Sequence, residues 1–138
     1  MMDMSEEIIN EEASPRWFLD IDWYQQNNRS LFTLAQHCLC YNCRERLETN
    51  ESNDSISELL AAIENCCSQG PDFITSRLPI MESVFRLILA NGNRPLELEE
   101  LGNQLRERLG GDTYRTSPEM LSRLLSNDRY YGLRQVGD

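Results

Sequence analysis

Cysteines are the residues of this chain whose type and spacing most directly suggest chemistry. Cys40 and Cys43 form a C-x2-C motif, and the pair Cys66 and Cys67 follows 22 residues later. A C-x2-C motif in a tight turn can direct two thiolates at one ion, as in a zinc knuckle. We therefore predict a structural zinc site with Cys40, Cys43, Cys66 and Cys67 as its ligands.

The fourth ligand of this site is the least determined. Neighbours on a regular helix point about 100° apart, so Cys66 and Cys67 can share one ion only if their helix unwinds. His37 and Cys38 are the alternates. An iron–sulfur cluster, which also uses thiolates, is the less favoured cofactor. The remaining interpretation is that the cysteines bind no metal and are small buried hydrophobes.

The sequence contains no recognisable catalytic constellation. It has no G-x-S-x-G, no P-loop and no G-x-G-x-x-G, and His37 is its single histidine. We therefore expect a non-enzymatic protein.

Capping residues and apolar periodicity predict the helices that must position the cysteines. Ser30 can cap one helix and Ser55 a second, whose apolar positions continue to Cys66 and Cys67. Residues 17–24 alternate in a way that fits a short strand, but a short helix fits equally well.

The second half of the chain predicts three helices and a closing strand. The helices begin near Pro79, after Pro95 and at Thr116, where Glu119 completes a capping box. Residues 130–136 are predicted to form the strand. Three short helices followed by a strand are typical of a winged helix-turn-helix.

The charges and the cysteines are distributed unevenly, which suggests two modules. Residues 1–74 contain all five cysteines and 14 acidic residues against four arginines, whereas the remainder carries nine of each charge. The predicted fold class is mainly α. We expect a disordered acidic N-terminus (1–14), a Cys-rich helical module (15–74) and a short-winged helix-turn-helix domain (75–138).

The C-terminal half also resembles a known family. The segment 82–101, ESVFRLILANGNRPLELEEL, and the segment 131–134, YGLR, resemble the winged-helix (HARE-HTH) module of the bacterial RNA polymerase delta subunit. The resemblance covers residues 77–136. It implies a role as an accessory or regulatory factor in transcription, although the wing is expected to be short and the acidic part precedes the module here.

The net charge of −10 limits the partners that we expect. Broad polybasic binding to nucleic acid or to an anionic membrane is excluded, because it needs a positive face. We expect a protein partner, with DNA as the less favoured alternative and a homodimer interface among the aromatics of 17–24. An acidic N-terminus without an apolar core suggests a cytoplasmic protein. The predicted contact residues are Arg115, Arg123, Arg129, Tyr130, Tyr131 and Arg134.

Two further functions are compatible with the sequence. The protein could be a structural component of another assembly, in which the winged helix never meets DNA. It could also be a metal or redox sensor that uses the cysteine cluster, with oxidation of Cys40 and Cys43 unfolding the first module.

Overall fold

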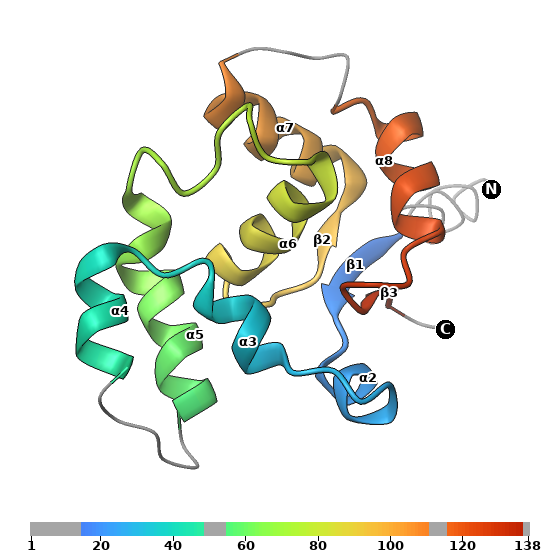
Figure 1. Ribbon diagram of the computed structural model, residues 1–138. Helices are drawn as coiled ribbons and strands as arrows, with labels where there is room; N and C mark the ends of the chain where they lie inside the picture. The colour runs from blue at the N-terminus through green and yellow to red at the C-terminus, as the bar shows by residue number, and fades with distance from the viewer. Residues whose placement is uncertain (1–14, 49–54, 111–115, 137–138) are drawn as a thin grey trace, which may run out of the picture.

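The computed structural model describes residues 15–48, 55–110 and 116–136. Within them the chain is mainly helical with a small three-stranded sheet, so the predicted mainly α class is confirmed (Figure 1). The elements in chain order are β1 (Arg16–Leu19), α2 (Ile21–Gln26), α3 (Leu31–Gln36), α4 (Tyr41–Glu48), α5 (Ser55–Asn65), the 3-10 turn η1 (Cys67–Gln69), α6 (Ile80–Ala90), β2 (Leu96–Glu97), α7 (Leu98–Leu109), α8 (Pro118–Ser126) and β3 (Leu133–Gln135). The segment 1–14, predicted to be disordered, lies outside the described residues.

Strand β1 is the central strand of the sheet and is antiparallel to both β2 and β3. Trp17 pairs with Leu96 on one side and with Gln135 on the other. Strand β1 comes from the predicted module 15–74, whereas β2 and β3 come from 75–138. The sheet therefore joins the two halves of the chain.

The turn after α6 holds the end of β1 in place. Asn93 has a left-handed backbone, with φ of 60°, a conformation that asparagine tolerates better than most residues. Its side-chain oxygen accepts a hydrogen bond from the Leu19 N–H at 2.8 Å, and its amide nitrogen donates to the Leu19 carbonyl at 3.0 Å. One side chain thus satisfies both backbone groups at the end of the strand.

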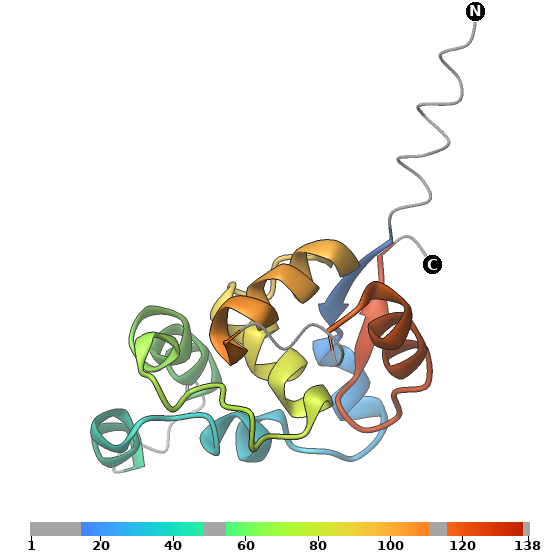
Figure 2. The same cartoon turned by 90° about the horizontal axis from the view of Figure 1, so that it is seen from above.

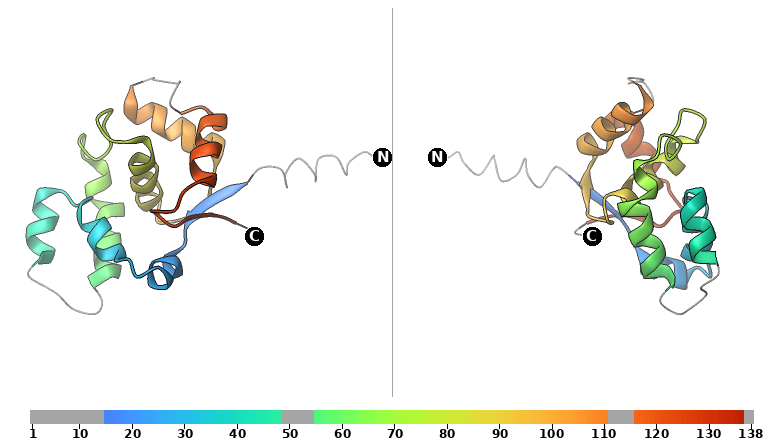
Figure 3. Two further views of the ribbon diagram at one scale, coloured as in Figure 1. Left: turned by 45° about the vertical axis from the view of Figure 1, so that its right-hand side comes forward. Right: turned by 90° about the vertical axis from the view of Figure 1, so that its left-hand side faces the viewer.

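Helix α6 lies in the middle of the molecule. Figures 2 and 3 show α4 and α5 at one end, the sheet and α8 at the other, and α6 between them. The buried apolar side chains, among them Ile63 of α5, Ile88 of α6 and Leu19 of β1, form one continuous core. No helix of the described ranges is long and apolar enough to cross a membrane.

Several predicted helix ends are confirmed, and one is corrected. Ser30 caps α3 by accepting a hydrogen bond from the Thr33 N–H, and α7 ends at Gly110. The predicted cap of α8 at Thr116 is wrong, because Ser117 precedes the helix and accepts a hydrogen bond from the Met120 N–H.

Thr116 is instead fully buried. Its hydroxyl accepts a hydrogen bond from the Arg106 guanidinium at 3.3 Å. The residue therefore packs the start of α8 against α7.

The ambiguous segment 17–24 contains both of the predicted alternatives. Strand β1 ends at Leu19 and α2 begins at Ile21. Asp20 stands at the start of α2, but its side chain makes no capping hydrogen bond and lies 3.4 Å from the Arg134 guanidinium. The carboxylate therefore links the start of α2 to β3.

The closing strand is shorter than the predicted 130–136. The Asp128 carboxylate accepts hydrogen bonds from the backbone N–H groups of Tyr130, Tyr131 and Leu133, at 2.9 to 3.1 Å. These bonds hold the chain in a turn, so only three residues remain for β3.

Candidate metal centre

Cys40 and Cys43 occupy the first turn of a helix, not the tight turn predicted from their spacing. Cys40 immediately precedes α4, and its carbonyl accepts a hydrogen bond from the Arg44 N–H at 2.9 Å. Cys43 is the third residue of α4 and is buried. Residues three apart in a helix lie on the same face, so the helical start still brings the two sulfurs together.

Cys66 and Cys67 sit where α5 stops being regular. The helix ends at Asn65, Cys66 has φ of −131° and ψ of −63°, and Cys67 begins η1. The break gives the neighbours different surroundings, since Cys66 is exposed and Cys67 is buried. It is the unwinding that the sequence required before both could face one ion.

Three of the four predicted ligands lie close together. The sulfur atoms of Cys40, Cys43 and Cys66 all lie within 4.8 Å of one another, so this group could hold a metal ion. The Cys67 sulfur lies 3.5 Å from that of Cys40 and accepts a hydrogen bond from the Cys40 backbone N–H at 3.2 Å. Cys67 therefore contacts Cys40 but does not belong to the group of three.

The two alternate ligands lie apart from this group. His37 is exposed, and its backbone carbonyl accepts a hydrogen bond from Arg86. Cys38 is buried, and its thiol donates to the Leu34 carbonyl at 3.8 Å. Neither side chain belongs to the sulfur group found among the described residues.

The cysteines differ in how readily they lose a proton. The Cys43 backbone N–H donates to the Cys40 sulfur, and this bond is the main reason why the pKa of Cys40 is lowered to about 7. Burial raises the pKa of Cys67 to about 12, and hydrogen bonding with Cys43 raises the pKa of Cys66. In the metal-free protein, Cys40 is therefore the first of these three to ionise.

Arg46 is a neighbour of the site that the sequence analysis did not identify. Its guanidinium donates to the Cys43 sulfur at 3.4 Å. A guanidinium beside a thiolate offsets part of the negative charge that several thiolates would bring together. Its position three residues after Cys43 was a usable signal only once α4 was known to be a helix.

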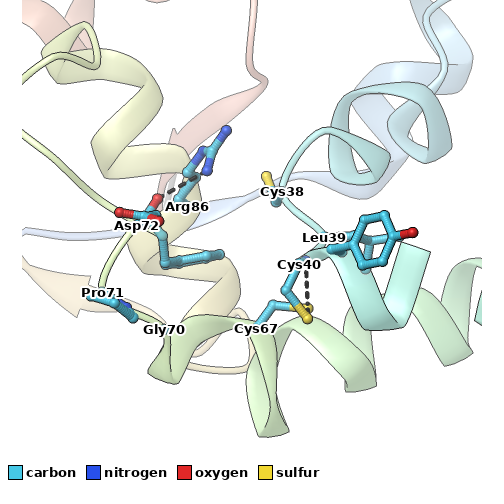
Figure 4. Close-up of a pocket in the computed structure, with 10 residues that line it drawn as sticks. Cys38, Leu39, Cys40, Cys67, Gly70, Pro71, Asp72 and Arg86 are labelled. Carbon is cyan, nitrogen blue, oxygen red and sulfur yellow. Dashed lines mark hydrogen bonds between the residues drawn. The ribbon is translucent and has the colours of Figure 1, made fainter. Parts of the chain in front are cut away.

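A pocket of about 300 Å³ opens beside the cysteines (Figure 4). Its lining includes Cys38, Cys40 and Cys67 on one side and Arg86 on the other. Cys43 and Cys66 are not among the lining residues.

Arg86 closes one wall of the pocket and was also missed by the sequence analysis. Its guanidinium donates to the carbonyls of Phe73 and His37, at 2.9 and 3.2 Å, and forms an ion pair with Glu82. Arg86 therefore links α6 both to the segment before the cysteine motif and to the loop after η1.

The predicted contact residues fall into different surroundings. Arg123 and Arg129 are exposed, and Tyr130 is 45% exposed. Tyr131 is half-buried, with its ring 5.1 Å from that of Phe85.

The last two predicted contact residues are Arg134 and Arg115. Arg134 is exposed but pairs with Asp20. Arg115 lies outside the described residues. Two of the aromatic residues proposed for a homodimer interface, Trp17 and Tyr24, are buried in the core of the chain.

Comparison with known proteins adds no relative. No protein-family model, no curated protein and no solved structure matches the chain. Interpretation of the site therefore depends on its own geometry.

Proposed function

We propose that this protein is a non-enzymatic accessory or regulatory factor whose cysteine region is held by a structural zinc ion. The observation that carries the proposal is the approach of the Cys40, Cys43 and Cys66 sulfurs to within 4.8 Å of one another. Cys67, whose sulfur is 3.5 Å from that of Cys40, is the fourth ligand that we propose.

Zinc fits this donor set better than other common ions. Structural zinc sites take four ligands, often all thiolates, and Zn–S bonds of about 2.3 Å place tetrahedral sulfurs about 3.8 Å apart. The sulfurs of Cys40, Cys43 and Cys66 are already grouped within 4.8 Å of one another, whereas that of Cys67, which is close to Cys40 alone, must move toward them to complete the tetrahedron. An iron–sulfur cluster uses the same ligand type and is the rival that a visible spectrum separates from colourless zinc.

The position of the cluster supports a structural role for the metal. It connects the start of α4 to the end of α5, two elements separated by the segment 49–54. A metal that closes such a connection contributes its binding energy to folding.

The proposed role in transcription rests on the resemblance to the delta-subunit module. The order α6, β2, α7, α8 and β3 is compatible with it, although β3 pairs with β1 from the start of the chain. We propose a protein contact around Tyr130, where the Arg29 guanidinium lies 4.4 Å from the ring centre. Exposed arginine and tyrosine are enriched at protein interfaces.

Metal analysis of the reduced protein tests the first part of the proposal. We expect one zinc per chain and no visible absorption. The Cys43→Ser variant should lose the metal, whereas Cys38→Ser should retain it, because the Cys38 thiol is directed at the Leu34 carbonyl. The zinc site would be overturned if the wild-type protein, purified without chelators and then incubated with zinc, is folded but contains no metal.

Binding measurements test the second part. The double variant Arg123→Ala/Arg129→Ala should weaken binding to purified RNA polymerase. A matched control, Arg94→Ala/Arg77→Ala, removes the same charge from other exposed positions and should have little effect. An equal loss of binding in both variants would show that the effect comes from net charge alone. No binding of duplex DNA even at low salt would exclude direct DNA recognition, and failure to bind polymerase as well would favour a structural role in another assembly.

A further inference from the structure

Two of the cysteines are placed so that they can react with each other. The sulfurs of Cys40 and Cys67 are 3.5 Å apart, and both residues line the same pocket (Figure 4). A disulfide requires an S–S distance of about 2.05 Å, so the two sulfurs must approach each other by about 1.5 Å. The pocket of about 300 Å³ is large enough to admit a small oxidant.

We propose that Cys40 and Cys67 form a disulfide when the protein meets hydrogen peroxide or a small organic hydroperoxide. This modification uses sulfurs of the proposed zinc site and in that respect rests on the proposed function. It converts two of the four ligands into a bond that cannot hold the metal, so oxidation and metal binding exclude each other.

The reaction balances with peroxide as the only oxidant. The Cys40 thiolate attacks one peroxide oxygen, the O–O bond breaks, and the leaving oxygen departs with the electron pair and takes up a proton. This gives a sulfenic acid on Cys40. The Cys67 sulfur then attacks the Cys40 sulfur, its thiol proton joins the departing hydroxide, and water leaves. The two thiols lose two electrons and hydrogen peroxide becomes two molecules of water.

The surroundings favour this pair over the C-x2-C pair that the sequence suggested. Cys43 does not line the pocket, and its sulfur receives a hydrogen bond from the Arg46 guanidinium. Cys38 does line the pocket, but its thiol is directed at the Leu34 carbonyl. Cys67 is the pocket-lining sulfur that lies within 3.5 Å of Cys40.

The sequence offers a direct way to detect the bond. The chain contains no lysine, so trypsin cleaves only after arginine and releases Cys38, Cys40 and Cys43 in one peptide, Ser30–Arg44, and Cys66 and Cys67 in another, Leu47–Arg77. A bond from Cys40 to Cys67 joins these two peptides, whereas a bond between Cys40 and Cys43 leaves them separate.

The experiment treats reduced, metal-free, full-length protein with hydrogen peroxide, blocks the remaining thiols and maps the peptides by mass spectrometry. We expect the joined peptide as the main product, with fragment ions that assign Cys40 and Cys67. The Cys38→Ser variant should give the same product and Cys67→Ser should not. Separate peptides carrying a Cys40–Cys43 bond, or sulfinic acid without a disulfide, would overturn the proposal.

A second measurement separates this proposal from the zinc site. Zinc-loaded protein is exposed to peroxide in the presence of a chromogenic zinc indicator. We expect zinc release in step with the joined peptide, and both reversed by a thiol reductant. Reduced protein that binds no zinc but still forms the joined peptide would contradict the proposed function and leave the disulfide standing. Zinc binding without a joined peptide would support the proposed function and contradict the disulfide.

Discussion

Helices α4 and α6 are held in the molecule in different ways. Six of the 11 residues of α6 are buried, among them Val84, Phe85 and Ile88. Of the α4 side chains that the structure describes, only that of Cys43 is buried. A helix of two turns is marginal by itself. Helix α6 is therefore fixed by extensive apolar burial, whereas the described part of α4 is attached mainly through Cys43 and the sulfur contacts beside it.

The largest effect is expected from removing apolar contact at the centre. Phe85 is 2% exposed and contacts Tyr131, so Phe85→Ala should lower the free energy of unfolding by about 3–5 kcal/mol. Urea denaturation with and without a chelator measures this cost. If α6 is held by apolar burial, Phe85→Ala lowers the free energy of unfolding by the same amount with and without the chelator. A loss that disappears on chelation would show that α6 also depends on the metal.

A smaller loss is expected where the turn after α6 holds β1. Asn93→Ala leaves the N–H and the carbonyl of Leu19 without their partner and should cost about 1–3 kcal/mol in thermal or urea unfolding. Asn93→Gly is the matched control, because glycine accepts the positive φ of this position but forms no side-chain bonds. Full stability of the glycine variant would assign the role of Asn93 to backbone conformation alone.

The cap of α8 should contribute less. Ser117→Ala removes the acceptor for the Met120 N–H and should cost about 0.5–2 kcal/mol. Glu119→Ala tests the predicted capping box, and we expect a smaller effect because the N-cap of α8 is Ser117, one residue after the predicted Thr116. A larger loss of stability in the Glu119 variant than in the Ser117 variant would favour the predicted capping box.

The smallest effect is a shift in the pH dependence of one thiol. The pKa of Cys40 is lowered to about 7, so its thiolate contributes to the stability of the metal-free fold at higher pH, and this contribution is lost as the pH falls through about 7. Alkylation of Cys40 by iodoacetamide should therefore be half-maximal near pH 7. Cys38, whose pKa burial raises to about 11, should remain unmodified at pH 8. A Cys40 midpoint near the ordinary value for cysteine, about 8.5, would contradict the helix-start geometry.

Much of the helical framework could be predicted because its signals are local. Ser30 stands at the start of α3 and Gly110 at the end of α7, each next to an apolar periodic pattern. Helix α4 was missed because its segment YNCRERLE carries no such pattern. The place of β1 between β2 and β3 was also missed, since it depends on residues about 80 and 117 positions away.

The candidate site was predictable in part for the same reason. The C-x2-C spacing and the later cysteine pair indicated Cys40, Cys43 and Cys66, which the structure brings together. The roles of Arg46 and Arg86 could not be predicted, because they depend on the direction of a helix and on contacts between distant segments. The metal itself, and Cys67 as its fourth ligand, stay predictions.

Hydrogen exchange of the peptides from α4 and α6, measured with and without bound zinc, tests whether the proposed ion holds α4 in place. We predict that metal removal leaves the protection of α6 unchanged and abolishes most of the protection of α4. Equal protection of α4 in the metal-free and zinc-loaded protein would contradict the proposed structural role of zinc, because the helix would then be held without the ion.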